Sequence, residues 1–264
     1  MLLSLLLITY FCIALNKKRY FIQIAYDGSL YHGWQTQPNA ITVQELLDQA
    51  MSTFFRQPIE TLGCGRTDSG VHATEFYAHF DIENLEESKV LQAVAGINAM
   101  LPYQIAAKRI IPVHEEAHAR FDATARAYKY YLHFEKDPFK FNRSWVVKDK
   151  LDINLMNQAA ALLLDYTDFS CFSKSNTQTF TNNCKIVKAV FEETDGGLVF
   201  TIEADRFLRN MVRAIMGTLV RVGKYEINLE EFKAVIESKN RSKAGQSVPA
   251  CGLYLVKVEY PYLR

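Results

Sequence analysis

Residues 63–73 read "GCGRTDSGVHA" and hold a single carboxylate, Asp68, among three glycines. Glycine adopts backbone conformations that other residues avoid and lets the main chain approach another molecule closely. The flanking stretches "TLGC" (61–64) and "TEFYAHFDIE" (74–83) predict strands that would hold this loop rigidly. Asp68 therefore has two interpretations: it caps a local amide in a surface turn, or it is a functional carboxylate on a rigid scaffold.

Outside the loop, strand and helix patterns alternate in two similar rounds. The first predicts a strand at 19–28, a helix at 42–55 with Thr42 as its N-cap, a helix at 88–101 and a strand at 105–113. The second predicts a strand at 126–135, a helix at 153–165 and a hairpin at 185–205 that turns at Asp195, Gly196 and Gly197.

This alternation predicts an α+β protein with two α/β halves, related by an old duplication. No low-complexity linker separates the halves, so we expect one continuous sheet rather than two tethered units. We place the domains at 19–115, which contains the Asp68 loop, and at 116–264, after an apolar extension at 1–18.

The composition is that of a globular protein: 264 residues, 49% hydrophobic and 22% charged, with a formal net charge of +1. The charge is unevenly distributed, because residues 206–225 carry four arginines and one lysine and no acidic residue. Such a run indicates either a solvated face or a site for a polyanion.

The five cysteines are scattered and form no C-x-x-C pair, which fits a reducing cytosol better than a disulfide framework. The six histidines have no metal-ligand spacing, and no phosphate-binding G-x-x-x-x-G-K-[ST] loop is present. We therefore expect a cytoplasmic protein that uses no metal and no cofactor.

The N-terminal run at 2–15 is apolar and would reach about 21 Å as a helix, short of the ~30 Å bilayer core. Its positive charges follow the apolar run instead of preceding it, unlike those of a secretory signal. We expect no stable membrane insertion. Of the two remaining explanations, an interfacial anchor and a misassigned translation start, we favour the second.

The stretch "RFLRNMVRAIMGTLVRVG" (206–223) predicts one amphipathic helix. In that helix Arg206, Arg209 and Arg213 would share a stripe away from the apolar side. No acidic residue lies within 206–223 to pair with them, and the planar fork of arginine suits phosphate or carboxylate partners. A solvated face is the alternative.

Six stretches carry a family resemblance: "AYDGSLYHGWQTQPNAITVQE", "GCGRTDSGVHA", "ARFDATARAYKYYL", "DFSCFSK", "FLRNMVRAIMGTLVRVG" and "AGQSVPACGLYLVKVEY". In this order, from about residue 20 to 260, they resemble the TruA family of tRNA pseudouridine synthases. The resemblance implies the pseudouridine synthase fold, with two RRM-like halves on a mostly antiparallel sheet and an RNA-binding cleft between them. It also implies a homodimer whose RNA contacts both subunits.

The implied reaction is isomerisation of uridine to pseudouridine in the tRNA anticodon stem-loop, at about nucleotides 38 to 40, on a base that has to be extruded from its stack. By motif matching, Asp68 is the nucleophile and attacks either the uracil ring or the ribose C1′. A carboxylate nucleophile has to stay ionised, and a nearby cation favours that.

The resemblance also assigns roles to other residues. Tyr128 stacks on the target base and assists proton removal from C5, Arg213 pairs with the catalytic carboxylate, and Arg66 takes the place of the extruded uridine. Substrate binding is further expected of Arg206, Arg209 and Lys174.

Two other classes of function remain open from the residues. A non-catalytic RRM-like RNA-binding protein could use the same basic and aromatic strands, and Asp68 would then be expendable. A hydrolase could combine Asp68 with His72 or His114, although it would need a metal or a serine elbow, and neither motif is present.

Overall fold

The computed structural model describes residues 17–83, 87–173 and 180–263. The apolar extension predicted at 1–18 therefore lies almost wholly outside the described residues, and so does Lys174. Within those residues, no helix combines the length and apolar character that a membrane span requires.

The predicted strands and helices occur in the predicted order, and the structure adds two strands, at 145–146 and 253–259, and a helix at 229–237. The strands are β1 (Lys17–Tyr26), β2 (Leu62–Gly63), β3 (His72–Glu83), β4 (Ile105–Pro112), β5 (Ala125–His133), β6 (Trp145–Val146), β7 (Ile186–Thr194), β8 (Gly197–Ala204) and β9 (Leu253–Glu259). The helices are α2 (Val43–Phe55), α3 (Glu87–Asn98), α4 (Ile153–Leu162), α5 (Met211–Gly223) and α6 (Leu229–Glu237).

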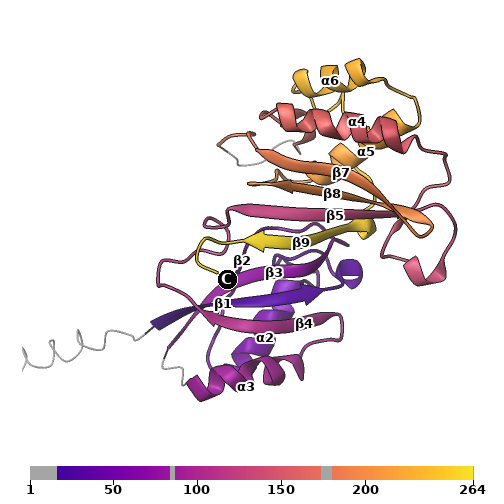
Figure 1. The fold of residues 1–264 in the computed structure, drawn as a ribbon. Helices are drawn as coiled ribbons and strands as arrows, with labels where there is room; N and C mark the ends of the chain where they lie inside the picture. The colour runs from indigo at the N-terminus through magenta and orange to yellow at the C-terminus, as the bar shows by residue number, and fades with distance from the viewer. Residues whose placement is uncertain (1–16, 84–86, 174–179, 264) are drawn as a thin grey trace, which may run out of the picture.

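All of these strands join one sheet, in the order β4-β1-β3-β9-β5-β8-β7, with β2 beside β3 and β6 beside β5 (Figure 1). The pairs are antiparallel except β3 with β9 and β5 with β6. The final strand β9 thus lies at the centre and joins the strands of the first round to those of the second. The predicted α+β class is confirmed, as a large mixed sheet.

Two hydrophobic cores form where helices pack on the sheet (Figure 1). In one, α2 and α3 cover β1 and β3, and Leu47, Met51 and Phe76 are fully buried. In the other, α4, α5 and α6 lie against β5, β7 and β8, and Ile215 and Phe232 are fully buried. The i, i+3, i+4 spacing of apolar residues that predicts α2 is the spacing that buries one side of it.

Local signals placed several element ends correctly. The Thr42 hydroxyl accepts from the Glu45 amide and caps α2 as predicted. The predicted hairpin is present as β7 and β8, with Gly196 at a φ of +68° in its turn. Gly197, predicted in that turn, is instead the first residue of β8.

The single helix predicted at 206–223 is wrong, because α5 begins only at Met211. Asn210, immediately before it, has a φ of +65°, a left-handed conformation that interrupts a helix and that asparagine tolerates better than most residues. The Asn210 side chain donates to the Ser247 hydroxyl, which holds it there. Arg206 and Arg209 therefore precede the helix, and the predicted stripe of three arginines on one helical face does not exist.

Gly252, directly before β9, gives a test of the central pairing. A Cβ at this position would lie 2.6 Å from the Tyr131 carbonyl oxygen and 2.7 Å from the Tyr130 ring. We expect Gly252→Ala to lower the free energy of unfolding by about 1–3 kcal/mol through overpacking. Gly65→Ala is the matched control, because nothing lies within 4 Å of its added Cβ. Urea denaturation measures both, and equal stability of the two variants would contradict the prediction.

Candidate active site

The loop between β2 and β3 is held by a second segment of the chain, residues 26–34. The Trp34 amide donates to the Thr67 carbonyl at 3.3 Å, and the Gly70 amide donates to the Tyr31 carbonyl at 3.3 Å. The Tyr26 hydroxyl also bonds the Thr67 hydroxyl at 2.8 Å. The loop that carries Asp68 is therefore fixed from outside, as the functional interpretation requires.

Two glycines of this second segment make the close approach possible. A Cβ on Gly28 would lie 2.0 Å from the Val71 carbonyl oxygen, and one on Gly33 would lie 2.4 Å from that of Thr67. Gly33 also has a φ of +89°, which disfavours any residue with a side chain. The sequence analysis missed this supporting role of "DGSLYHGW" (27–34), whose two glycines were its signal.

The Asp68 carboxylate faces arginines of the other half of the chain. Arg213 Nη1 lies 3.4 Å from Asp68 Oδ2, and Arg209 Nε lies 3.7 Å from Asp68 Oδ1. The Asp68 side chain is 26% exposed, so it is shielded yet open to another molecule. Among the described residues no nearby amide donates to this side chain, so the interpretation of Asp68 as a local cap does not hold.

Arg213 is held in a defined direction. It lies in the first turn of α5, and its neighbours Ala214 and Ile215 are fully buried. Arg213 Nε donates to the Val248 carbonyl at 2.8 Å, which leaves Nη1 directed toward Asp68. The expected pairing of Arg213 with Asp68 is thus present, and Arg209 joins it from the turn before the helix.

Tyr128 lies beside these groups on β5. Its half-buried ring packs edge-on against Phe207, with ring centroids 5.1 Å apart. Burial raises the pKa of the Tyr128 hydroxyl; the charge of Arg126 opposes this rise, and the charge of Asp68 adds to it. The hydroxyl is therefore protonated near neutral pH.

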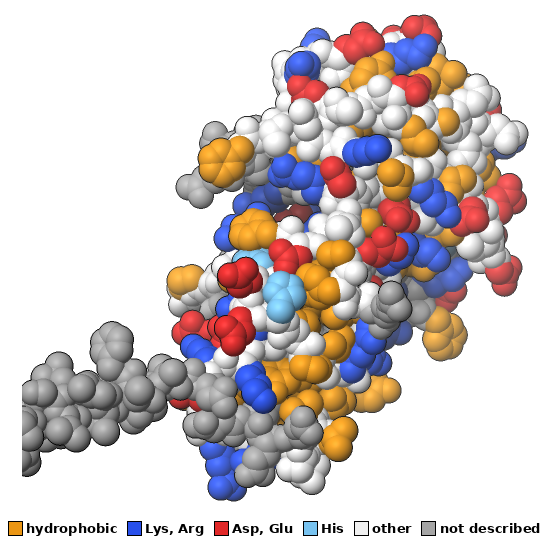
Figure 2. Space-filling view, turned by 60° about the vertical axis from the view of Figure 1, so that its left-hand side comes forward, with side chains coloured by type: hydrophobic (Ala, Val, Ile, Leu, Met, Phe, Trp, Pro, Cys, Tyr) orange, Lys and Arg blue, Asp and Glu red, His pale blue; other side chains and the backbone are white. Residues whose placement is uncertain are grey.

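The remaining predicted arginines, Arg66 and Arg206, form a basic cluster beside the loop together with Arg120 and Arg126. The pKa of Arg120 is lowered by burial and by the charges of the other three arginines. Figure 2 shows a hollow in one face of the molecule, with Lys and Arg side chains gathered along its border. Like charges brought together without an acidic partner favour a polyanionic ligand.

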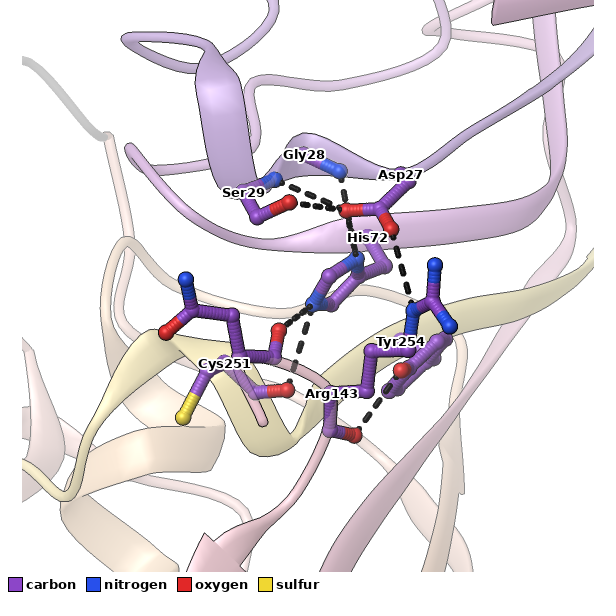
Figure 3. A network of polar contacts seen from close by, with 8 residues as sticks. Asp27, Gly28, Ser29, His72, Arg143, Cys251 and Tyr254 are labelled. Atoms are coloured by element: carbon purple, nitrogen blue, oxygen red, sulfur yellow. Dashed lines mark hydrogen bonds and ion pairs between the residues drawn. The ribbon is translucent and has the colours of Figure 1, made fainter. Parts of the chain in front are cut away.

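His72, at the end of the loop, has a structural role (Figure 3). Its Nδ1 accepts from the Gly28 amide at 3.1 Å, and its Nε2 donates to the Asn142 and Cys251 carbonyls at 3.1 and 3.2 Å. Burial lowers the pKa of His72, in keeping with a neutral ring. Both ring nitrogens are occupied, so His72 is not available as a base for Asp68.

The other elements of a hydrolase are also missing from the described residues. His114 packs edge-on against Tyr262. The part of the chain that the structure describes has no group of three or more His, Cys, Asp or Glu side chains able to hold a metal ion.

Comparisons with known proteins identify relatives of this chain. The family described as tRNA pseudouridine synthase matches residues 159–261. The protein named tRNA pseudouridine synthase A of Bacteroides fragilis is 49% identical over 248 residues, which cover 94% of this chain and 98% of the relative. The proteins of that name from Parabacteroides distasonis and Neisseria meningitidis serogroup C are 49% and 40% identical and cover 92% and 93% of this chain, and 96% and 93% of their own lengths.

The chain belongs to the tRNA pseudouridine synthase A family. The resemblance inferred from the six motifs is confirmed, and so is the class of enzyme, an isomerase. The Asp68 loop, β5 and α5 all lie in stretches that carry this resemblance.

Gly33 tests whether the supporting segment positions the loop. Gly33→Ala adds the cost of a left-handed alanine, about 1–2 kcal/mol, and a clash with the loop at Thr67. Gly196→Ala is the control, because its φ of +68° brings the same kind of strain with no atom closer than 3.8 Å. We expect Gly33→Ala to lose more stability and to speed amide hydrogen exchange at Gly70. Unchanged exchange at Gly70 would show that the contact does not hold the loop.

Proposed function

We propose that this chain isomerises uridine to pseudouridine in the anticodon stem-loop of tRNA, with Asp68 as the nucleophile. The observation that carries the proposal is the Asp68 carboxylate on an externally braced loop, 3.4 Å from the anchored Arg213. Membership of the tRNA pseudouridine synthase A family supplies the reaction and the substrate class. The target nucleotides, about 38 to 40, and base extrusion come from the resemblance.

The proposed reaction needs no net oxidation or hydrolysis. An Asp68 oxygen forms a bond to the uracil ring or to ribose C1′, and the C1′–N1 bond breaks. The uracil then turns so that C5 bonds to C1′, the C5 proton leaves, N1 gains a proton and Asp68 is released. Arg213 orients the carboxylate throughout, since a bidentate or anchored guanidinium fixes both position and charge.

Tyr128 has a narrower role in this proposal than the resemblance alone implies. Its hydroxyl is protonated near neutral pH, since burial raises its pKa. It therefore suits stacking against the target base and hydrogen-bond donation. The Tyr128 hydroxyl could accept the C5 proton only if it gave up its own proton to another group.

The basic cluster would bind the RNA. The Arg66 and Arg206 guanidiniums have no hydrogen-bond or ion-pair partner among the described residues, and Arg66 is exposed beside Asp68 in the loop. We propose that Arg66 fills the place of the extruded uridine and that Arg206 and Arg209 contact phosphates. Lys174, which lies outside the described residues, is proposed as a further substrate contact.

At the level of the fold, we propose that the units 19–115 and 116–264 act as two RRM-like halves with the RNA between them. The two hydrophobic cores support this division in that each draws most of its residues from one unit, while β9 residues such as Leu255 join the core of the first unit and Val71 joins that of the second. We also propose that the chain works as a homodimer, as the resemblance implies.

Asp68→Asn tests the nucleophile. The amide is nearly the same size but a poor nucleophile, so the variant should fold, bind tRNA with similar affinity and form no pseudouridine. Tritium release from tRNA labelled at uracil C5 measures the reaction. Asp195→Asn, in the exposed β7–β8 turn, is the control and should retain activity. Turnover by Asp68→Asn would remove Asp68 from the mechanism as the nucleophile, whereas a wild type that forms no pseudouridine would favour the alternative of a non-catalytic RNA-binding protein.

Arg213→Lys separates positioning from RNA binding. Lysine keeps the charge but cannot bond Val248 and Asp68 at once with a planar fork. We expect kcat to fall about 100-fold, since a displacement of ~1 Å can cost that much, with the Kd for tRNA nearly unchanged. Arg209→Lys, at a side chain that is 58% exposed, should change the Kd more than kcat. Single-turnover kinetics distinguish the positioning role of Arg213 from an RNA-binding role. If Arg213→Lys changes only the Kd, Arg213 is an RNA contact.

A further inference from the structure

Arg126, the second residue of β5, uses its guanidinium in an unusual way. Nη1 donates to the carbonyls of Ala123 at 3.4 Å and Asp205 at 3.2 Å, and Nη2 donates to those of Cys64 at 3.0 Å and Arg120 at 2.7 Å. All four acceptors are main-chain oxygens. In the described part of the chain no carboxylate forms an ion pair with Arg126.

These bonds use every terminal donor of the side chain. Each terminal nitrogen of a guanidinium carries two hydrogens, so four acceptors occupy all four N–H groups. Arg126 therefore has no terminal donor left for a phosphate, although it lies in the same basic cluster as Arg66 and Arg206. Its place in the basic cluster suggests RNA binding, whereas its bonds indicate internal support.

Two of the four carbonyls, those of Cys64 and Asp205, belong to segments that carry the candidate site. Cys64 begins the loop of Asp68, and its amide is held by the Tyr77 carbonyl at 2.7 Å. Asp205 follows β8 and leads directly to Arg206 and Phe207, whose ring packs on Tyr128. The guanidinium of Arg126 thus connects the start of the Asp68 loop to the end of β8, which leads to the Phe207 ring that packs on Tyr128.

We infer that Arg126 is a positioning residue for the reaction proposed above: it fixes the main chain at Cys64 and Asp205 so that Asp68 and Tyr128 keep their relative position. The inference rests on the proposed function for its effect on rate. Its structural part, the bracing of the loop, does not depend on the reaction.

The test compares Arg126→Lys and Arg126→Gln with Arg221→Lys. Arg221 lies near the far end of α5 and pairs with Glu226, so the control makes the same chemical change away from the site. Lysine keeps the charge and loses the fork that reaches four acceptors. The readouts are single-turnover pseudouridine formation, the Kd for tRNA and amide hydrogen exchange across residues 64–71.

We expect both Arg126 variants to fold, to exchange the loop amides at least about tenfold faster and to lose about 10- to 100-fold in kcat, as for a misplaced nucleophile. The Kd for tRNA should stay within about threefold, because no phosphate contact is lost. Arg221→Lys should match the wild type in all three readouts.

Three results would overturn the inference. Unchanged loop exchange with unchanged kcat would mean that the carbonyl contacts brace nothing. A loss confined to Kd would make Arg126 a phosphate contact. Unfolding of both variants would mean that Arg126 supports the whole fold. If the wild type itself forms no pseudouridine, the proposed function fails, while loop exchange still decides the role of Arg126.

Discussion

Two residue pairs hold the site together: β9 runs parallel to β3 at His72 with Tyr254 and at Ala73 with Leu255. Leu255 also pairs with Tyr128 of β5. Because neighbouring strands lie ~4.8 Å apart, the end of the Asp68 loop and Tyr128 are brought within about 10 Å of each other across β9. Without this central strand, the braced loop and the aromatic strand would belong to separate sheets, and Arg213 would have no carboxylate to face.

Around that junction, arginine side chains have different roles. Arg213 donates to a carbonyl and to Asp68, so it orients a carboxylate. Arg126 donates from both terminal nitrogens to four carbonyls and supports the backbone. Arg66 is exposed and has no partner in the described chain, so it is free to meet a ligand. All of these arginines carry the same charge, so it is their hydrogen-bond partners that distinguish a structural arginine from one that is available to bind a ligand.

Much of the fold could be predicted from local pattern. The apolar spacing and Thr42 cap of α2 and the turn between β7 and β8 are encoded within a few residues of where they act. The helix predicted at 206–223 failed because its apolar spacing continues unbroken through residues 206–210, which precede the start of α5 and are not helical. The left-handed Asn210 depends on the distant Ser247, which no local pattern reports. The bracing of the loop by Gly28 and Gly33 was missed because the glycines are visible in the sequence, whereas the distant loop residues that they approach are not.

The sequence by itself determined the alternation of strands and helices, the family through six ordered motifs, and the choice of Asp68, Tyr128 and Arg213 as candidates. Only the tertiary structure decided that Arg213 and Arg209 face Asp68, that both ring nitrogens of His72 are bonded, and that Arg126 binds main-chain carbonyls. The physical reason is that the partners of His72 and Arg126 are almost all main-chain groups. Every residue presents the same carbonyl, so residue types cannot reveal such a bond before the chain is folded.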